Sequence, residues 1–234
     1  MKRFWKEAAV APGDEGYVIH LDGRPMRMPG GPQLILRHLP LAEAIRDEWQ
    51  AAGGGPGGEM TYDHVPLTRL AGTAQHRVAA DPMASVDALA QYGETDLLCY
   101  RATHPEPLIR RQEEHWRPWL DWAALELDAP LLVTSGILHI AQPPDALRAM
   151  RARLATHNPE TLAGLGIVIP VLGSLVLGLA LADGKLDAAR AHELSLLDEL
   201  FQEEAWGEDF EATKRRAHVA ADLAVAERFI RLSQ

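Results

Sequence analysis

The sequence predicts an α+β fold in which a small antiparallel β-containing domain is followed by a larger, mainly α-helical domain. Two observations lead to this prediction. Residues 17–28 alternate apolar and polar side chains around an Asp-Gly pair, as the strands of a β-hairpin do. From Pro66 onward, apolar residues recur at helical spacing in segments separated by prolines and glycines. We expect the β-rich domain, with one helix, over residues 1–65 and the helical domain over residues 66–234.

The strands of the first domain are located by its turn. Asp22-Gly23 readily adopts the positive φ angles of a two-residue hairpin turn, so Tyr17–Leu21 and Arg24–Met28 are predicted to pair. Gln33–Arg37 is expected to form another short strand, and Phe4–Val10 is a candidate partner for the same sheet.

One helix, Pro40–Ala52, completes this domain, because proline suits a first turn. Its inward stripe is expected to contain Leu41, Ile45, Trp49 and Ala52. The flexible break Gly53–Gly58 follows, reading GGGPGG. Its glycines fit the spacing G-x-G-x-x-G, but they follow a helix rather than a strand, so we expect no dinucleotide site there.

Helical periodicity divides most of the remaining chain into segments with recognisable ends. Asp187 is a suitable N-cap, Gly207 a suitable stop, and Asp209 a suitable cap for the last helix. Leu131–Ile140 is either one strand or an extended connection. The predicted helices are Leu67–Ala80, Pro82–Leu98, Glu106–Leu127, Pro144–His157, Thr161–Ile167, Pro170–Ala182, Asp187–Trp206 and Asp209–Leu232.

The composition limits the kinds of partner. The formal net charge of −10 disfavours nucleic acids and anionic membranes, because both attract clustered Lys and Arg. A single cysteine, Cys99, rules out an internal disulfide and fits a reducing compartment. The longest apolar run, Ile167–Ala182, is interrupted and shorter than the roughly 20 residues that span a bilayer. We expect it to form the buried centre of the helical domain.

No motif for a metal, a nucleotide or a catalytic nucleophile is recognisable. The histidines lack metal-ligand spacing, and neither a phosphate-binding loop nor a nucleophile elbow occurs. Cys99 stands between apolar residues, so a buried small hydrophobe is favoured over a nucleophile. We therefore expect no cofactor and no metal.

Two other sets of residues have both a structural and a functional interpretation. Trp116, Trp119 and Trp122 are spaced three apart, which fits a core stripe or an aromatic anchor for a protein partner. Arg69 and Asp96 are ionisable residues in apolar surroundings. They form either a buried structural pair or part of a polar pocket, and the structural pair is favoured.

The acidic stretch Leu197–Glu211 is the strongest candidate for a functional site. At about 100° per residue, a helix running through it divides into two opposed faces. A carboxylate, an amide and an indole N–H on one face could bind exposed backbone or basic groups. That polar face contains Ser195, Glu199, Gln202 and Trp206, and the opposite, inward face contains Leu194, Leu197, Phe201 and Ala205.

Three interpretations of this stretch remain open from the residues alone. It is a recognition surface, a solvated acidic face of a surface helix, or a pair of carboxylates for acid–base catalysis. The third lacks an evident nucleophile or electrophile to complete a site. Glu199 is the residue on which all three interpretations centre.

Six motifs along the chain together resemble one known family. This family comprises assembly chaperones for the catalytic sector of F-type ATP synthase, specifically those acting on its α subunit. The resemblance covers nearly the whole length. The motifs are Leu21–Pro29 (LDGRPMRMP), Glu48-Trp49, Pro66–Leu70 (PLTRL), Thr95–Arg101 (TDLLCYR), Leu172–Leu181 (LGSLVLGLAL) and Leu197–Asp209 (LDELFQEEAWGED).

The resemblance implies a non-enzymatic chaperone that binds the unassembled α subunit and covers its interface until the β subunit arrives. No nucleotide, no nucleic acid and no membrane insertion are expected. A bacterial member is expected in the cytoplasm, and eukaryotic relatives in the mitochondrial matrix. The family's important carboxylate matches Glu199 best, with Asp198 as the neighbouring alternative. Supporting roles are expected for Trp49, Arg69, Asp96 and Asp209.

Two departures and one alternative function accompany this resemblance. The GGGPGG linker is unusually rich in glycine, and Gln75-His76 stands where an acidic residue would be more typical. Both leave the geometry of the domain junction open. The alternative function is a small-molecule enzyme that uses Glu199 or Asp198 as a general base in an interdomain cleft.

Overall fold

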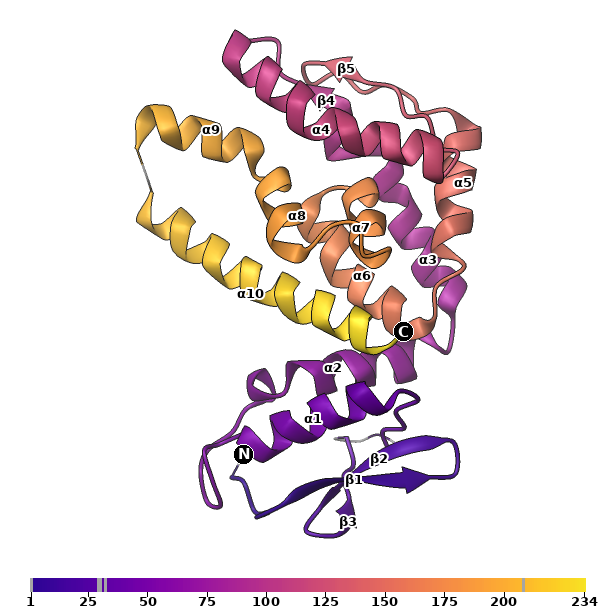
Figure 1. Cartoon of the computed structure of the whole chain (residues 1–234), viewed down its shortest axis with the longest axis vertical. Helices are drawn as coiled ribbons and strands as arrows, with labels where there is room; N and C mark the ends of the chain where they lie inside the picture. The colour runs from indigo at the N-terminus through magenta and orange to yellow at the C-terminus, as the bar shows by residue number, and fades with distance from the viewer. Residues whose placement is uncertain (1, 29–30, 32, 208) are drawn as a thin grey trace. The chain divides into compact units, whose positions relative to one another are not determined.

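The computed structural model describes residues 2–28, 31, 33–207 and 209–234 of the chain (Figure 1). The chain forms two compact units. Unit 1 comprises Met1–Asp81, Pro159–Gly164 and Arg228–Gln234, and unit 2 comprises Pro82–Asn158 and Leu165–Glu227. The domain boundary after residue 65 stays a prediction about independent folding. The α+β class itself is confirmed, because a small antiparallel sheet precedes a mostly helical region.

The sheet of unit 1 contains three antiparallel strands in the order β1-β2-β3. Its members are β1 (Ala8–Gly13), β2 (Gly16–Leu21) and β3 (Arg24–Pro25). The predicted hairpin turn is confirmed, with φ angles of 49° at Asp22 and 77° at Gly23. The Asp22 carboxylate also accepts hydrogen bonds from the backbone N–H groups of residues 6 and 7, which ties the turn to the start of the chain.

Three predicted strands differ in the structure, the first of them being Arg24–Met28, of which only Arg24–Pro25 is strand. Gln33–Arg37 forms only isolated bridges, one of them from Gln33 to Arg27. The first strand starts at Ala8 rather than at Phe4, because the preceding residues bind the end of a helix instead. Arg3 donates to the carbonyls of residues 50 and 52, and the Trp5 indole donates to that of residue 49. Pro29 of the first family motif lies outside the described residues.

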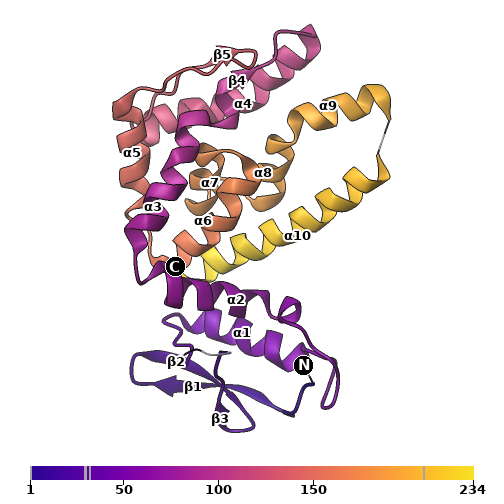
Figure 2. The same ribbon diagram turned by 180° about the vertical axis from the view of Figure 1, so that it is seen from behind.

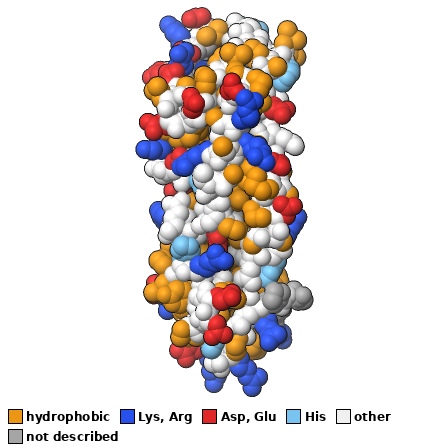
Figure 3. All heavy atoms as spheres, turned by 90° about the vertical axis from the view of Figure 1, so that its right-hand side faces the viewer, with side chains coloured by type: hydrophobic (Ala, Val, Ile, Leu, Met, Phe, Trp, Pro, Cys, Tyr) orange, Lys and Arg blue, Asp and Glu red, His pale blue; other side chains and the backbone are white. Residues whose placement is uncertain are grey.

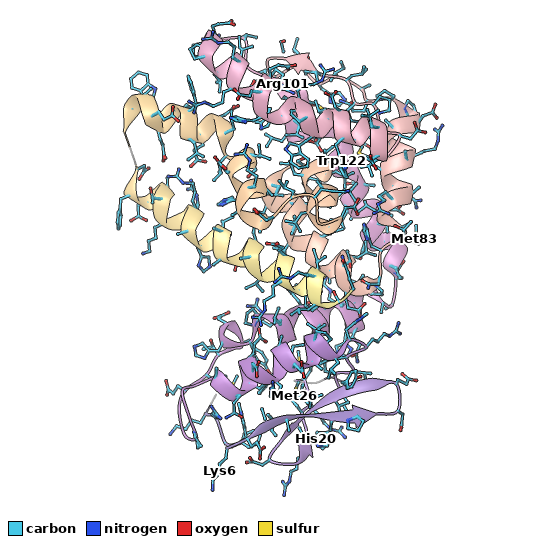
Figure 4. The ribbon with its side chains drawn as sticks, viewed as in Figure 1. Lys6, His20, Met26, Met83, Arg101 and Trp122 are labelled. Carbon is cyan, nitrogen blue, oxygen red and sulfur yellow. The ribbon has the colours of Figure 1, made fainter. Side chains whose placement is uncertain are left out.

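Helix α1 (Leu39–Ala51) presents the inward stripe that its spacing predicts. All four predicted residues are buried (Leu41, Ile45, Trp49 and Ala52). Met26, labelled in Figure 4, is buried in the same unit. After a short 3₁₀ turn (Tyr62–His64) comes α2 (Pro66–Thr73), which continues into a π-helical turn at Ala74–Val78.

Glu48 and Trp49 join α1 to the beginning of α2. The Glu48 carboxylate accepts from the backbone N–H groups of Leu67 (2.7 Å) and Thr68 (3.1 Å), while the Trp49 indole donates to the Thr68 hydroxyl (2.9 Å). The first N–H groups of a helix lack partners within the helix, and Val65 supplies no side-chain cap. Burial raises the pKa of Glu48 despite these bonds. Two family motifs thus form one structural joint.

Gln75 forms a second joint in unit 1. Its amide accepts from the backbone N–H of Ile35 (2.8 Å) and donates to the carbonyl of Gln33 (2.9 Å). A carboxylate could accept the first bond but could not donate the second. This explains physically why an amide suits a position where an acidic residue was expected.

The elements of unit 2 are mainly helical (Figures 1 and 2). Helices α6 (Pro159–Leu172) and α10 (Phe210–Leu232) each contribute one end to unit 1. Residues 131–140 contain a strand of two residues, β5 (Thr134–Ser135), which pairs in parallel with β4 (Tyr100–Arg101). The other elements are α3 (Pro82–Ala90), 3₁₀ turns at Gln91–Thr95 and Leu97–Cys99, α4 (Glu106–Glu126), α5 (Pro144–Leu154), α7 (Leu175–Ala182), α8 (Ala188–Ser195) and α9 (Leu197–Trp206).

The second half of the apolar run Ile167–Ala182 is core, as predicted, since every residue of α7 is buried, whereas Pro170 and Val171 in its first half are exposed. Its helix boundary differs from the prediction. Pro170 lies inside α6, and the break comes at Gly173, whose φ of 62° suits glycine. Ser174 then caps α7 by accepting from the N–H of Leu177. Among the described residues, no helix combines the length and apolarity needed to cross a membrane.

The predicted helix Pro82–Leu98 ends early, at Ala90, and a 3₁₀ turn leads from it to Asp96, which joins two further motifs. Its fully buried carboxylate accepts from the Ser174 hydroxyl (2.8 Å) and from the N–H groups of Val176 and Leu98 (both 3.0 Å). The bonds from Ser174 and Val176 stand at the start of α7, where the helix dipole favours a negative charge. Burial nevertheless raises the pKa of Asp96 to about 6. The TDLLCYR motif is thereby fixed to LGSLVLGLAL.

The tryptophans of α4 follow the core interpretation to different degrees. Trp116 is fully buried, and its indole donates to the carbonyl of Leu194 (2.9 Å). Arg101, labelled in Figure 4, lies with its guanidinium 5.3 Å from the Trp116 ring centroid. Trp119 and Trp122 are half-buried. Cys99 is buried, as expected for a small hydrophobe, and burial raises the pKa of its thiol to about 12.

Candidate functional site

The predicted helix Asp187–Trp206 is two helices in the structure. Asp187 caps α8 as expected, by accepting from the N–H of Arg190 (2.7 Å). Helix α8 ends at Ser195, and Leu196, with a ψ of 7°, separates it from α9. The Ser195 hydroxyl turns back to donate to the carbonyl of His192 (2.8 Å). The prediction that Ser195 shares one helix face with the α9 residues is therefore wrong, because the helical phase is interrupted between them.

One side of α9 is bound to α4. The Asp198 carboxylate accepts from the side-chain amide of Gln112 (2.7 Å), whose oxygen accepts from the N–H of Ala102. Arg111 donates to both carboxylate oxygens of Glu204 (2.6 and 2.8 Å) and lies over the Phe201 ring. The Arg111 bonds hold the pKa of Glu204 below its usual range. This side combines ionic and aromatic contacts rather than forming a purely apolar core.

The opposite side of α9 is bound to α10. Arg216 donates to both oxygens of Glu203 (2.6 and 2.7 Å) and to one oxygen of Glu199 (2.8 Å). The Glu203 side chain is 16% exposed and that of Glu199 is 38% exposed. Arg215 lies 3.9 Å from Glu199 and is largely exposed. Glu199 is thus half-buried, neutralised on one oxygen and accessible at the outer part of its carboxylate.

The C-terminal end of α9 presents the exposed part of the site. Gln202 is exposed, and Trp206 is 89% exposed. Gly207 stops the helix as predicted, with a φ of 92°. Ala205 was predicted to face inward, but it is exposed, because the packed part of α9 ends before it. The acidic stretch therefore has a bound first half and an exposed end.

The predicted supporting residues occupy different places. Trp49 is buried in the α1–α2 joint and Asp96 in the joint at α7. Arg69 is exposed and pairs with Asp63 (3.0 Å), so the expected Arg69–Asp96 pair is wrong. Arg69 pairs with Asp63, and Asp96 accepts a hydrogen bond from Ser174 instead. Asp209 is exposed and accepts from the N–H of Glu211 (2.9 Å), as expected of a cap for α10.

Sequence reasoning missed the residues that hold α9 in place. Arg111, Gln112 and Arg216 supply its ionic and amide contacts, yet none belongs to a predicted site or motif. A weak signal was available: no Lys, Arg or His occurs between His192 and Lys214, so the carboxylates of this stretch needed cations from elsewhere. Phe210, 77% exposed at the start of α10, was also missed.

Tryptophan is enriched among the residues that dominate protein interfaces, so the exposed Trp206, on a helix bound from two sides, makes this helix end a candidate protein-binding surface. Comparisons with known proteins identify chaperones as relatives of this chain. The family model of the ATP12 chaperone protein matches residues 2–124. Atp12 from Paracoccus denitrificans has a crystal structure with a TM-score of 0.94 and 42% sequence identity, and the match covers 100% of this chain and 98% of that one.

Two further proteins are similar to this chain. The Atu1473 protein from Agrobacterium tumefaciens has a TM-score of 0.93 and 37% identity, with 100% of this chain and 86% of that chain covered. The mitochondrial protein atp12 from Schizosaccharomyces pombe is 24% identical over 218 residues, which cover 88% of this chain and 74% of that protein. The chain belongs to the ATP12 chaperone family, the ATP synthase assembly chaperones that its motifs resemble.

Proposed function

We propose that this protein binds the unassembled α subunit of F-type ATP synthase and prevents its aggregation until the β subunit joins it. Membership of the ATP12 chaperone family supports the role in assembly. The observation that supports a protein client most directly is the exposed end of α9, where Trp206 is 89% exposed on a helix fixed from two sides. Tryptophan is prominent among residues that dominate binding energy in protein interfaces.

This function requires no chemical step. An orphan subunit that exposes an apolar interface aggregates readily, and a protein that covers this interface suppresses aggregation by mass action. Glu199 and Asp198 suit such binding better than general-base catalysis. Glu199 accepts from the Arg216 guanidinium and Asp198 from the Gln112 amide, so both carboxylates already act as hydrogen-bond acceptors for side chains of other helices. We therefore propose a non-catalytic role, in the cytoplasm of a bacterium.

Within the site, we propose different roles for the α9 residues. Gln202 and Trp206 are exposed and available for direct contact with the client. Glu199 bonds to Arg216 through one oxygen, which leaves its outer part available for a basic group of the client. Asp198 positions α9 on α4 through Gln112. A role for Ser195 remains a prediction, and its place in α8 makes it an indirect one.

The test is a binding and aggregation assay with the purified, unassembled α subunit. Equimolar protein should suppress light scattering by the subunit and form a complex that survives size-exclusion chromatography. Glu199→Gln should weaken this complex about tenfold, which corresponds to about 1.4 kcal/mol. If the full-length protein neither forms the complex nor reduces scattering, the proposed function is wrong.

Glu203→Gln is the matched control, because Glu203 binds the same arginine but is less exposed. A larger loss of affinity for Glu199→Gln than for Glu203→Gln supports direct contact between Glu199 and the client. Equal losses mean that both act only by holding Arg216, and they would refute the direct contact. Urea denaturation of each variant confirms that the fold is retained.

A further inference from the structure

The region where α9 ends and α10 begins exposes two aromatic side chains. Trp206 is 89% exposed and Phe210 is 77% exposed. Other tryptophans differ: Trp5 and Trp116 are fully buried, and Trp49 is 4% exposed. Large aromatic rings bury much apolar surface when they bind and lose little conformational freedom. A pair of them left in solvent needs an explanation beyond the stability of the fold.

Both aromatic residues stand on supported helices. The two hydrogen bonds from Arg111 to Glu204 hold α9 just before Trp206. The two hydrogen bonds from Arg216 to Glu203 connect α9 to the second turn of α10, near Phe210. Because the backbone that carries each ring is already fixed, binding through the rings would cost little further ordering. This is the arrangement expected of an anchor.

The charges next to these rings along the chain are acidic, and the exposed Lys214 follows one helical turn after Phe210. No Lys, Arg or His occurs between His192 and Lys214, whereas carboxylates are frequent there. Asp209 and Glu211 flank Phe210, and both are exposed. Among the described residues, neither carboxylate has a basic side chain within ion-pair distance. A complementary surface would therefore offer an apolar pocket with basic side chains at its rim. Anionic lipids and nucleic acids have the opposite requirement.

We infer that Trp206 and Phe210 form a paired aromatic anchor that inserts into an apolar pocket of the α subunit, and that Asp209 and Glu211 pair with basic side chains bordering that pocket. This inference rests on the proposed function and names the part of the surface that makes the contact. The aromatic rings hold the complex, and the carboxylates speed its formation. Affinity and association rate thereby depend on different residues.

Other exposed apolar residues lack this combination. Leu125 and Ile137 are 84% and 97% exposed in the same unit, but they are aliphatic. Near the top of Figure 3, at the level of α4 and β5, hydrophobic side chains are scattered among both acidic and basic ones. Leu125→Ala is therefore a matched control: it removes a comparably exposed side chain from unit 2 without touching the proposed anchor.

The experiment measures association and dissociation rates of the purified α subunit with the immobilised full-length protein, at low and high salt. Trp206→Ala and Phe210→Ala should raise the dissociation rate roughly 10- to 100-fold for the pair and leave the association rate nearly unchanged. Asp209→Asn with Glu211→Gln should lower the association rate a few-fold at low salt only. Asparagine keeps the helix cap, and glutamine keeps the shape of the side chain.

The outcomes separate this inference from the proposed function. If wild-type protein binds the α subunit but both aromatic variants dissociate like Leu125→Ala, the anchor is refuted and the chaperone role stands. If wild-type protein does not bind at all, the proposed function fails first. If the aromatic variants instead change the oligomeric state of the free protein, the anchor binds a second copy of the chain, and the inference is wrong. Unchanged urea midpoints show that the variants are folded.

Discussion

Two groups of carboxylates in this protein have opposite surroundings. Asp96 is buried and Glu48 is half-buried, and both accept hydrogen bonds from backbone N–H groups at helix beginnings. Glu199 and Glu203 on α9 are bound instead by the guanidinium of Arg216 and reach the surface to different extents. Burial raises the pKa of both members of the first group. In the second group, an arginine supplies the compensating charge.

This difference shows that a family motif need not be a binding site. Glu48-Trp49 joins PLTRL, and TDLLCYR joins LGSLVLGLAL, so four of the motifs hold elements of the fold together. LDELFQEEAWGED differs, because after its arginine-bound half it ends in exposed residues. The comparison predicts that substitutions in the first group affect stability and that substitutions in the second affect client binding.

The largest expected effect is on stability, from Asp96→Ala. It leaves a buried hydroxyl and two buried N–H groups without their acceptor, which should cost about 3 kcal/mol of unfolding free energy. Urea denaturation measures this loss. Asp222→Ala, which removes an exposed carboxylate of α10, is the control and should stay within about 0.5 kcal/mol. Similar values for both variants would contradict the structural role of Asp96.

The pH dependence of stability provides a second comparison. The pKa of Asp96 is about 6 in the folded protein and about 3.8 in the unfolded chain. Between these values the folded state binds more protons, so the contribution of Asp96 to stability decreases as the pH rises from about 4 to about 6. This contribution should amount to roughly 2–3 kcal/mol. Asp96→Asn should remove this pH dependence, so the difference in unfolding free energy in favour of the wild type should fall by that amount as the pH rises across this range.

Histidines act in the opposite direction in part of this range. Burial lowers the pKa of His157 and His192, so their contribution to stability is lost as the pH falls below about 6.5. Both histidines are present in the wild type and in Asp96→Asn, so the difference between the two proteins isolates Asp96. A pH-independent difference would show that Asp96 stays ionised throughout.

Glu48→Ala should have an intermediate effect. The variant removes the carboxylate that accepts from the N–H groups of Leu67 and Thr68, at a cost of about 1–2 kcal/mol. Glu43→Ala on the exposed side of the same helix should change the unfolding free energy by less than about 0.5 kcal/mol. Thermal or urea unfolding of the two variants tests whether the bonds from Glu48 to the start of α2 stabilise unit 1, rather than the presence of any carboxylate on α1.

Ser195→Ala should have the smallest effect in either assay. Its hydroxyl donates only to the carbonyl of His192, at the end of α8. Stability should change by less than about 0.5 kcal/mol, and affinity for the α subunit should stay within about twofold, which is about 0.4 kcal/mol. A tenfold loss of affinity would mean that Ser195 shares a binding face with the residues of α9, as the sequence predicts, and would contradict the break at Leu196.

Local patterns predicted the local structure well. The turn at Asp22-Gly23, the stripe of α1 and the burial of α7 follow from the periodicity and turn chemistry of neighbouring residues. The partners of ionisable groups did not follow. Asp96 binds Ser174, which is 78 residues away, and Glu204 binds Arg111, which is 93 residues away. No local spacing encodes such pairs.

The candidate site could likewise be predicted only as far as local patterns describe it. Its position on the acidic helix and the exposure of Trp206 can be read from residues 197–211. The break at Leu196 could not be, because Leu194 and Leu197 continue the apolar spacing on both sides of it and both are buried. The arginines that divide the carboxylates of α9 between α4 and α10 come from distant parts of the chain.

One paired measurement tests most directly whether the two groups of carboxylates serve different purposes. Affinity for the α subunit and the urea midpoint are determined for Glu199→Gln and Asp96→Asn, with affinities measured where both variants are fully folded. We expect Glu199→Gln to lower affinity about tenfold with an almost unchanged midpoint, and Asp96→Asn to lower the midpoint with unchanged affinity. If Glu199→Gln instead lowers the midpoint and leaves affinity unchanged, Glu199 belongs with the structural carboxylates and the account is wrong.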